Sequence, residues 1–456
     1  MRTRPFHRLA PLALMLLLAA ACTSGPAAHR PDPAPYTSTT RLQDWPMYHR
    51  TASRSGSVAT GPSGRLQRTW SAQLVGQVYG EPLVVGSTLV VATERNYVYG
   101  LRARTGTVRW RVHLGTPQPL SALQCGNIDP LGITGSPAYD RGTGSVLVVA
   151  ETTGGHHTLW ALDAATGARR WHRGLDTQPG RDRSAEQQRS ALLVADGQVV
   201  TVFGGLAGDC GNYVGYAASV ATDGSGSVHS YAVPTAREAG MWSPPGPVRG
   251  PNGQVYVATG NGAELQGRWD TSDSVIELAP GTLRRLSVFA PATWRDDNVH
   301  DLDLGSMSPA VVPAADRLVI AGKRGVVYLL RPHLGGVGSV VASVPGCTAF
   351  GGAAVTGRTV LMPCQGQNAV RALRVGTTSL RWSWTAEGVY SSPVVAGGKV
   401  YVADQQSGDL VVLRLRDGSA LQRLPAGPLP HFPSQVVSGD WVFVPTLSGV
   451  SAFRGR

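Results

Sequence analysis

Short runs of alternating apolar and polar residues, each ending at a Gly turn, dominate the sequence. Segments 98–110 (VYGLRARTGTVRW) and 159–171 (LWALDAATGARRW) share one register: a strand, a Thr-Gly turn and a second strand that ends in Trp. Alternation bounded by Gly predicts β-strands joined as hairpins. A second hairpin precedes most copies and is clearest at 82–92 and 393–403. Two hairpins per repeat predict a four-stranded antiparallel sheet.

The repeat recurs along the chain at intervals of 41 to 61 residues. Its turn glycines are Gly106, Gly167, Gly224, Gly281, Gly335, Gly376 and Gly418. One such sheet cannot cover both of its faces, whereas sheets arranged radially bury each face against the next. The pattern therefore predicts an all-β fold, an eight-bladed β-propeller over residues 44–456. If the Gly335 copy is only an elaboration of a neighbouring blade, the propeller has seven blades. Two β-sandwiches are a further alternative, but the sequence shows no linker that would divide them.

The last blade has to be assembled from both ends of the chain, because only seven copies have a complete final hairpin. Segments 441–445 and 449–453 supply inner strands, and 66–70 aligns with the strand that ends in Trp110. We predict that the amino-terminal strand at 66–70 closes this blade. Such closure leaves no free radial edge.

Composition supports the β prediction and limits the classes of function. The chain of 456 residues contains 57 Gly and 32 Pro, and only 15% of it is charged. This density of helix breakers argues against helix bundles and repeated βαβ units. The formal net charge of +12 comes mainly from scattered Arg. Because no basic run or basic helical face gathers that charge, we expect no nucleic-acid partner. We interpret the positive charge as a source of solubility and of affinity for the cell wall or for lipid.

The amino terminus has the order of a secretory signal. Residues 1–21 have a basic start followed by an apolar run, and Cys22 comes directly after three Ala. This arrangement resembles a bacterial lipobox, in which the Cys thiol carries diacylglycerol, although Ala19 stands where Leu is commoner. An ordinary cleavage site with an incidental Cys is the alternative. The Pro-rich segment 22–43 is typical of a tether, so we expect a protein lipid-anchored at the outer face of the bacterial cell membrane.

Four cysteines follow the leader and allow three disulfide pairings. An even number in an oxidising compartment predicts two disulfides. Cys347 and Cys364 flank the predicted turn at 356–358, so we favour this pair across one hairpin. Cys125 and Cys210 then pair, and their shared Cys-Gly-Asn tripeptide indicates equivalent loops of neighbouring blades. The absence of a CxxC motif leaves structural zinc without a ligand set.

The motif Ala-Leu-Asp-x-x-Thr-Gly-x-x-x-Trp at 161–171 and the opening Asp-Trp-Pro-Met-Tyr at 44–48 resemble the repeat of the pyrroloquinoline-quinone-type propeller family. The resemblance covers essentially the whole mature chain. It implies that the Trp packs against the neighbouring blade and that Thr-Gly forms the turn, features that specify fold and not activity. Quinoprotein dehydrogenases and non-catalytic lipoprotein scaffolds, such as one that assists outer-membrane β-barrel assembly, share this repeat.

The resemblance also implies a cofactor site in the middle of the chain. In it Trp242 forms the floor beneath the quinone, Asn261 ligates calcium and Lys323 contacts the quinone oxygens. A flat indole can stack on a conjugated ring, and an amide oxygen suits a hard cation. Asp301 matches the base that removes the alcohol proton, with Asp303 as the second choice. The alternatives are core packing for Trp242, an ordinary turn at Asn261 and a solvated acidic loop at Asp301.

The sequence departs from the dehydrogenase pattern at three points. Segment 208–216, where the resemblance implies a calcium ligand, contains no Glu, so only Asp209 could substitute. No two cysteines are adjacent, so the vicinal disulfide over the quinone is missing. There is no Cys-x-x-Cys-His for covalent haem. Without the Glu carboxylate the cation binds more weakly and the quinone loses its Lewis acid.

These departures favour a monomeric, lipid-anchored propeller that acts as a scaffold for a ligand or a protein partner. A dehydrogenase of an alcohol or sugar, dependent on pyrroloquinoline quinone and Ca²⁺, is the competing hypothesis. A sensor or binding protein for cell-wall polysaccharide is the third.

Overall fold

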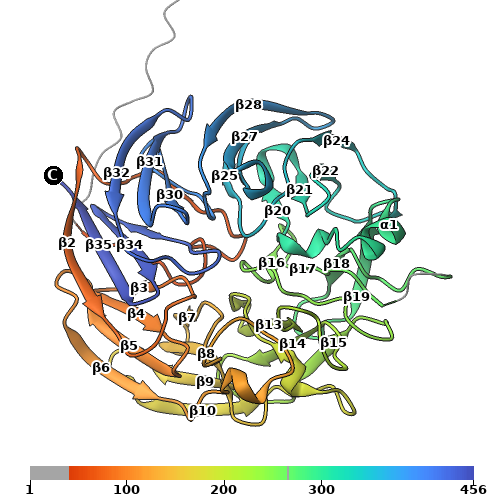
Figure 1. The fold of residues 1–456 in the computed structure, drawn as a ribbon, viewed down its shortest axis with the longest axis horizontal. Helices are drawn as coiled ribbons and strands as arrows, with labels where there is room; N and C mark the ends of the chain where they lie inside the picture. Colours follow the sequence, from red (N-terminus) through yellow and green to blue (C-terminus); the bar gives the residue numbers. More distant parts are fainter. Residues whose placement is uncertain (1–40, 264–266) are drawn as a thin grey trace, which may run out of the picture. The chain divides into compact units, whose positions relative to one another are not determined.

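The computed structural model describes residues 41–263 and 267–456. The predicted signal segment, Cys22 and most of the predicted tether lie outside the described residues. The described part of the chain contains eight β-sheets arranged around one axis (Figure 1), which confirms the all-β, eight-bladed β-propeller. In each blade the first strand lies nearest the axis and the fourth lies at the rim.

The first four blades follow one another along the chain. Their strands are β3 (Leu83–Val85), β4 (Thr88–Ala92), β5 (Tyr97–Arg102) and β6 (Val108–His113) in blade 1; β7 (Ala138–Asp140), β8 (Ser145–Thr152), β9 (His156–Asp163) and β10 (Arg169–Gly174) in blade 2; β12 (Leu193–Ala195), β13 (Gln198–Gly205), β14 (Tyr216–Ala221) and β15 (His229–Ala232) in blade 3; and β16 (Val248–Arg249), β17 (Val255–Ala258), β18 (Val275–Leu278) and β19 (Arg285–Ala290) in blade 4. A short strand, β11 (Glu186–Gln187), also pairs with β13.

The last four blades complete the ring. Their strands are β20 (Ala310–Val312), β21 (Arg317–Ala321), β22 (Val326–Leu330) and β24 (Ala342–Pro345) in blade 5; β25 (Ala354–Thr356), β26 (Thr359–Cys364), β27 (Ala369–Val375) and β28 (Leu380–Glu387) in blade 6; β29 (Val394–Ala396), β30 (Lys399–Asp404), β31 (Asp409–Arg414) and β32 (Ala420–Pro425) in blade 7; and β33 (Val436–Ser438), β34 (Trp441–Thr446), β35 (Gly449–Gly455) and β2 (Leu66–Gln73) in blade 8. β1 (Ser57–Val58) pairs with β29, and β23 (Gly336–Val337) pairs with β19.

Helical structure is confined to short connections. These are α1 (Trp294–Val299) and the 3-10 turns η1 (Leu120–Ala122), η2 (Arg183–Ala185), η3 (Leu304–Ser306), η4 (Pro313–Ala315) and η5 (Gln365–Gln367). Within the described residues, no helix has the length and apolar character needed to cross a membrane.

Strand β2 closes the ring, as the sequence predicts. It pairs antiparallel with β35 from Leu66 opposite Gly455 to Gln73 opposite Gly449. An elaboration is also present near Gly335. The segment between β22 and β24 of blade 5 contains β23, which pairs with β19 of blade 4. That elaboration adds to a complete blade 5, so the count of eight holds.

A Trp of one blade covers the Gly turn of the next, which explains the repeat physically. The Trp70 indole N–H donates to the Ala103 carbonyl of blade 1 at 3.2 Å, and its ring lies against Gly106. Gly106 has a φ of +74°, and a Cβ there would lie 2.6 Å from the ring. Only Gly satisfies both the left-handed turn and the close approach of the indole. Trp110 and Gly167 repeat this contact between blades 1 and 2.

The segment before β1 spans the axis and holds several blades together. Trp45 pairs with Val84 of blade 1, and the buried Arg54 donates to the Leu192 carbonyl of blade 3 at 2.9 Å. On the opposite side of the ring, the Tyr48 hydroxyl donates to Ser392 at 2.7 Å. The Asp-Trp-Pro-Met-Tyr opening therefore belongs to the propeller and forms part of its axial packing.

Both favoured disulfides form, but two expectations about their surroundings are wrong. Cys125 lies between β6 and β7, whereas its partner Cys210 lies between β13 and β14 inside blade 3, so the two loops are not equivalent. Cys347 lies in the connection before β25, so its bond to Cys364 ties an interblade loop to β26 and does not cross one hairpin. A shared tripeptide or a nearby turn does not specify where a loop lies around the axis.

Buried carboxyl groups make the stability of the propeller depend on pH. Burial raises the pKa of Glu94 to about 8 and the pKa values of Glu81 and Glu186 to about 7, from an ordinary value of 4.5. At pH values between the unfolded pKa of 4.5 and the folded pKa values, the folded state binds more protons than the unfolded state. The stability that the protonated carboxyls contribute is therefore complete below about pH 4.5 and is lost as the pH rises through 7 to 8.

We expect Glu94→Gln to reduce this pH dependence. Gln keeps an acceptor for the Gly132 N–H, which now bonds to Glu94 Oε2 at 2.8 Å, but cannot ionise. The fall in unfolding free energy between pH 5 and pH 9 should shrink by about 4 kcal/mol in the variant, at about 1.4 kcal/mol per pKa unit. Urea unfolding at both pH values measures this, with the exposed Glu387→Gln as the control. An unchanged slope in Glu94→Gln would contradict the assignment.

Candidate functional site

Residues from blades 3, 4 and 5 meet near the axis, and we call them the Asp303 cluster: the side chains of Trp242, Asp301, Asp303 and Lys323 and the backbone of Asn261. Trp242 precedes β16, and Asn261 follows β17. Asp301 and Asp303 lie between α1 and η3, and Lys323 lies in the turn between β21 and β22. The structure thus brings together the four residues that the resemblance implies, and the second choice, Asp303, with them.

Asp303 is the centre of this cluster. Its Oδ1 accepts the backbone N–H of Asn261 at 2.6 Å, and its Oδ2 accepts the Trp242 indole N–H at 3.2 Å. The Lys323 Nζ lies 2.9 Å from Asp303 Oδ2, 2.7 Å from Asp301 Oδ1 and 5.6 Å from the centroid of the Trp242 ring. The Lys323 ammonium therefore bridges two carboxylates above the indole.

The two carboxylates differ in burial, and this difference separates their roles. The side chain of Asp303 is 4% exposed, whereas that of Asp301 is 64% exposed. Burial raises the pKa of Asp303, although the Lys323 charge and the hydrogen bonds oppose the rise. Burial lowers the pKa of Lys323, but the charges and hydrogen bonds of Asp303 and Asp301 together outweigh burial, and the net direction is upward. Asp303 is therefore the buried carboxylate of the cluster, whereas Asp301, the first choice from the sequence, lies at its solvent-exposed edge.

Close approach between loops explains why the cluster forms. The backbone N–H of Lys323 donates to the Asp303 carbonyl at 2.8 Å. A Cβ at Gly322 would collide with that same carbonyl oxygen, so the Ala-Gly-Lys turn needs Gly there. The Asn261 side chain comes from a loop that Asp303 itself holds in place.

Asp209 does not join the cluster through any hydrogen bond or ion pair between described residues. Its Oδ1 accepts the Tyr213 hydroxyl at 2.5 Å, and its carbonyl accepts the Arg237 guanidinium at 3.0 Å. Across the described chain, no group of three or more His, Cys, Asp or Glu side chains is arranged to hold a metal ion. The calcium site that the resemblance implies at Asp209 and Asn261 therefore has no convergent set of carboxylates among the described residues.

The donor set does not fit the Ca²⁺ that the resemblance implies. Calcium takes six to eight oxygen ligands, but both oxygens of Asp303 already accept hydrogen bonds and the Lys323 ammonium supplies the counter-charge. A cation at Asp303 would have to displace Lys323. The flat surface of Trp242 suits a planar ring in principle, but its immediate neighbours are already cations and aromatic rings.

Three residues beside Trp242 were not predicted from the sequence. The Arg189 guanidinium lies 5.7 Å from the Trp242 ring centroid, and the Phe350 and Phe432 rings each lie 6.3 Å from it. These residues come from the loops before β12, β25 and β33. No motif surrounds any of them, and Arg189 is one of 39 Arg in the chain. Only the ring topology places them together.

Comparison with known proteins agrees with this fold. A family model described as outer membrane protein assembly factor BamB matches residues 58–207 and 215–424. No curated protein matches the sequence.

Similar solved structures include both functional branches. The quinohemoprotein alcohol dehydrogenase from Comamonas testosteroni has a TM-score of 0.68 and 18% identity, with 91% of this chain and 81% of that chain covered. A europium-containing methanol dehydrogenase has a TM-score of 0.68 and 15% identity, with 90% and 98% covered. BamB from Moraxella catarrhalis has a TM-score of 0.59 and 16% identity, with 86% and 98% covered. At these identities the likeness shows the fold alone.

Proposed function

Because the chain belongs to the family described as outer membrane protein assembly factor BamB, we propose that it is an extracytoplasmic binding scaffold for a ligand or a protein partner. The two disulfides support an oxidising compartment. Lipid attachment at Cys22 and a position at the outer face of the cell membrane are part of the same proposal. The signal segment 1–21 and the tether 22–43 would present the propeller at that surface.

The observation that carries this proposal is the self-neutralised Asp303 cluster. A buried carboxylate with two N–H donors and its own ammonium partner is a satisfied network. Such a network holds loops of blades 3, 4 and 5 in fixed positions. A general base needs a free acceptor within reach of the proton that it removes, and Asp303 has both oxygens engaged. The cluster is therefore better suited to shaping the axial end of the propeller than to chemistry.

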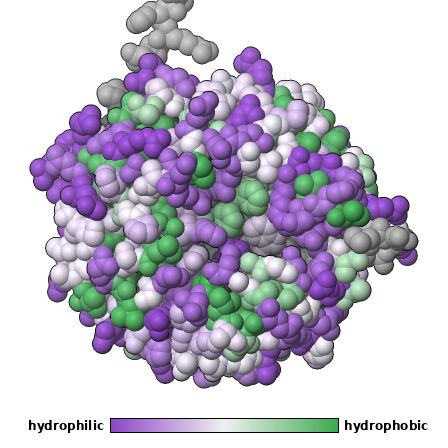
Figure 2. Space-filling view, in the orientation of Figure 1, coloured by the Kyte–Doolittle hydropathy of each residue, from purple (hydrophilic) through white to green (hydrophobic). Residues whose placement is uncertain are grey.

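The molecular surface supports reversible binding. The face drawn in Figure 2 is mainly hydrophilic, and its hydrophobic residues form small separate groups. Non-obligate interfaces are about as polar as the rest of a protein surface, whereas permanent ones are more apolar. This face therefore fits a partner that binds and dissociates.

The proposed function is tested by crosslinking from the axial loops in intact cells. A photo-crosslinking amino acid replaces His431, an exposed loop residue before β33, and Arg381, an exposed residue on the rim strand β28, serves as the control. We expect an adduct from position 431 and not from position 381. Mass spectrometry then separates a protein adduct from a polysaccharide one. No adduct from 431, or equal adducts from both positions, would overturn the scaffold proposal.

The second candidate, a quinone- and Ca²⁺-dependent dehydrogenase, is favoured by one observation, the convergence of Trp242, Asn261, Asp303 and Lys323. Incubation of the purified protein with pyrroloquinoline quinone and Ca²⁺, followed by dye-linked alcohol oxidation, tests it directly. The scaffold proposal expects neither a shift in quinone absorbance nor turnover. Turnover that disappears in Asp303→Asn would replace that proposal with the dehydrogenase.

A further inference from the structure

The two ends of each blade differ in the chain segments that they present. Antiparallel pairing places the β3–β4 and β5–β6 turns at one end of blade 1, and the β4–β5 turn and the connection to blade 2 at the other. We call these ends the turn face and the loop face, and the other blades repeat the arrangement. The Asp303 cluster belongs to the loop face, because its residues come from the connections before β16 and β20 and from the turns after β17 and β21.

At the rim of blades 8 and 1 (Figure 1), the turn face carries a basic surface that we call the turn patch. Its exposed members are Arg65 and Arg68, at the start of β2, and Arg102, Val108 and Arg109, beside the β5–β6 turn. The two groups are neighbours, because β2 contacts the β5–β6 turn through the indole bond to its first carbonyl. No Asp or Glu occurs between positions 44 and 81 or between 94 and 129.

The charge of the turn patch is not cancelled by the carboxylates of its own blades. Asp44 Oδ2 lies 2.7 Å from the Arg141 guanidinium, and Asp440 of blade 8 is buried. Arg109 donates to the hydroxyls of the β3–β4 hairpin at 2.9 and 3.1 Å, which are neutral groups. The exposed carboxylates of the turn face, among the described residues, belong to blades 3, 5 and 7: Asp196, Asp223, Asp316 and Asp417.

The predicted tether joins the propeller beside the turn patch. Gln43 exchanges two hydrogen bonds with the Ser438 hydroxyl at the β33–β34 turn, at 2.8 and 2.7 Å. Asp44 Oδ1 accepts the Gly86 N–H at 2.8 Å, next to the turn residue that Arg109 contacts. Nineteen positions separate residue 41 from Cys22, and a flexible chain of that length spans about 25 Å on average. An anchor at Cys22 would therefore keep the turn face of blades 8 and 1 near the membrane.

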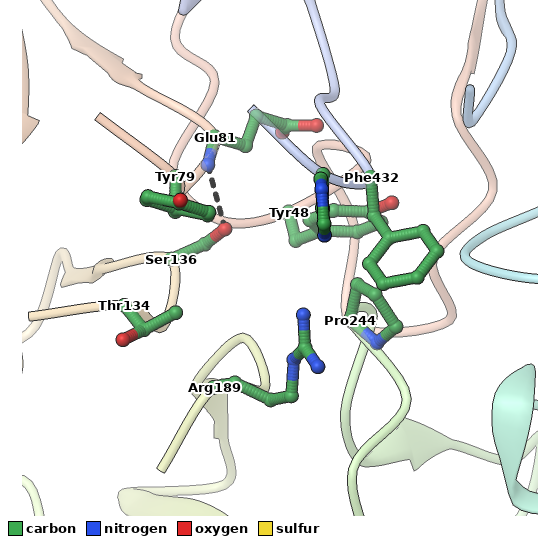
Figure 3. A pocket seen from close by; sticks show the side chains of 10 residues that line it. Tyr48, Tyr79, Glu81, Thr134, Ser136, Arg189, Pro244 and Phe432 are labelled. Carbon is green, nitrogen blue, oxygen red and sulfur yellow. Dashed lines mark hydrogen bonds between the residues drawn. The ribbon is translucent and has the colours of Figure 1, made fainter. Parts of the chain in front are cut away.

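The loop face offers no comparable cationic surface. Its axial pocket (Figure 3) contains the Arg189 guanidinium, but the pocket has a volume of only about 20 Å³, enough for one or two waters. Exposed carboxylates are spread around this face over blades 1, 2, 4 and 6: Asp129, Asp176, Asp296, Asp301 and Glu387. Like charges repel, so an anionic surface approaches the turn patch more favourably than the loop face.

We propose that the turn patch docks on anionic phospholipid headgroups of the membrane that holds the tether, so that the loop face and the Asp303 cluster point away from that membrane. Guanidinium groups bind phosphate oxygens through paired N–H donors, and an anionic membrane attracts basic residues within a Debye length. The exposed Val108 adds an apolar contact among the arginines. The inference rests on the lipid attachment at Cys22 in the proposed function and deepens it, because it fixes which face meets the partner.

Vesicle binding by the propeller alone tests the turn patch without the anchor. Residues 41–456 contain all eight blades, the closing strand and both disulfides, so this part keeps the whole folded ring. Sedimentation compares vesicles of phosphatidylcholine containing about one third phosphatidylglycerol with pure phosphatidylcholine at about 0.1 M salt. We expect binding to the anionic vesicles to be tighter by about tenfold or more, and to be lost at about 1 M salt. Equal binding to both kinds of vesicle would overturn the inference.

Two variants of equal net charge locate the surface. The patch variant combines three substitutions in the turn patch: Arg65→Gln, Arg102→Gln and Arg109→Gln. The control variant combines three at exposed positions of the loop face: Arg95→Gln, Arg183→Gln and Arg295→Gln. The patch variant should bind anionic vesicles about tenfold or more weakly than the unchanged propeller, and the control should stay within about twofold of it. Equal losses in the two variants would show attraction by net charge alone and would overturn the inference.

A smaller variant keeps the test usable if the patch variant does not fold. Arg65→Gln combined with Arg68→Gln leaves the bonds of Arg109 to the β3–β4 hairpin in place. It should still weaken binding to anionic vesicles by about fivefold or more. Unchanged affinity in this folded variant would place the lipid contact elsewhere.

An acidic polymer of the cell wall is the competing occupant of the turn patch. Soluble poly(glycerol phosphate) presents the same phosphate chemistry without a bilayer and serves as the probe. Val108→Ser should weaken vesicle binding about two- to fivefold and leave polymer binding unchanged. Polymer that binds as tightly as vesicles of equal phosphate concentration, or Val108→Ser without effect on vesicle binding, would overturn the membrane assignment.

Failure of this inference is distinguishable from failure of the proposed function. Mass spectrometry of the protein isolated from cells shows whether Cys22 carries an acyl group. An unmodified Cys22 would overturn the lipid attachment and this orientation with it. An acylated Cys22 in a protein whose propeller does not prefer anionic vesicles would overturn this inference alone and leave the scaffold proposal standing.

Discussion

Replacing Asp303 by Ala is expected to lower the free energy of unfolding by about 3 to 5 kcal/mol. The substitution leaves the Lys323 ammonium without its buried partner and removes the acceptor of the Trp242 indole and the Asn261 backbone. Breaking a buried pair from one side is costly because the remaining charge stays desolvated. Urea unfolding at pH 7 measures the effect, with Asp316→Ala as the control, because the Asp316 side chain is 78% exposed.

A double variant separates the ion pair from simple loss of packing. Asp303→Leu combined with Lys323→Met removes both charges and keeps apolar volume, so it should recover at least half of the stability lost in Asp303→Ala. Lys323→Met also removes the partner of Asp301, but that side chain is 64% exposed and its carboxylate stays solvated. A single variant that costs less than about 1 kcal/mol, or a double variant no more stable than the single one, would contradict the central position of Asp303.

The blades could be predicted from the sequence because each contact that defines them is local and repeated. Alternation fixes the strands, and the Trp that covers the Gly turn of the next blade recurs at the same register. Trp70 falls into this register although it lies more than 370 residues from its partner strand β35. The eighth blade was therefore predictable, because β2 matches the Trp-ending strand of the repeat but has no preceding strand to form a hairpin with, and so has to pair with the carboxyl-terminal strands.

The candidate site was predictable only in part. The resemblance identifies Trp242, Asn261 and Lys323, but only Leu302 separates Asp301 from Asp303, and motif matching cannot tell which carboxylate is buried. Burial is decided by the Lys323 turn, which closes over the Asp303 carbonyl.

Contacts across the axis were not predictable from the sequence. Arg189 and Phe432 are more than 240 positions apart and have no motif, yet they lie 5.2 Å from guanidinium to ring centroid. The Cys125–Cys210 bond links loops of different kinds for the same reason. Residues that meet at the hub of a ring share a position in space but no local sequence signal.

The closing strand should carry more of the stability than any other segment of its length. Replacing Leu66–Gln73 by an eight-residue Gly-Ser linker removes the fourth strand of blade 8 and leaves the edge of β35 unpaired. The change also removes the buried Leu66 and the Trp70 ring from the turn of blade 1. Loss of a packed Trp costs about 3 to 5 kcal/mol and loss of a buried Leu about 2 to 5 kcal/mol. Their sum reaches the whole stability of a typical domain.

The linker variant is therefore expected to lose its cooperative unfolding transition and to self-associate through the exposed edge. Circular dichroism during urea unfolding follows the first effect, and sedimentation velocity follows the second. Gln67→Ser combined with Thr69→Ser changes two exposed positions of the same strand, so this control should keep the wild-type sedimentation coefficient and the wild-type transition. A linker variant that unfolds cooperatively at the wild-type midpoint would show that the ring does not need β2. In that case the axial segment from Trp45 to Arg54, which bonds to blades on both sides of the ring, would be the element that holds the two ends of the propeller together.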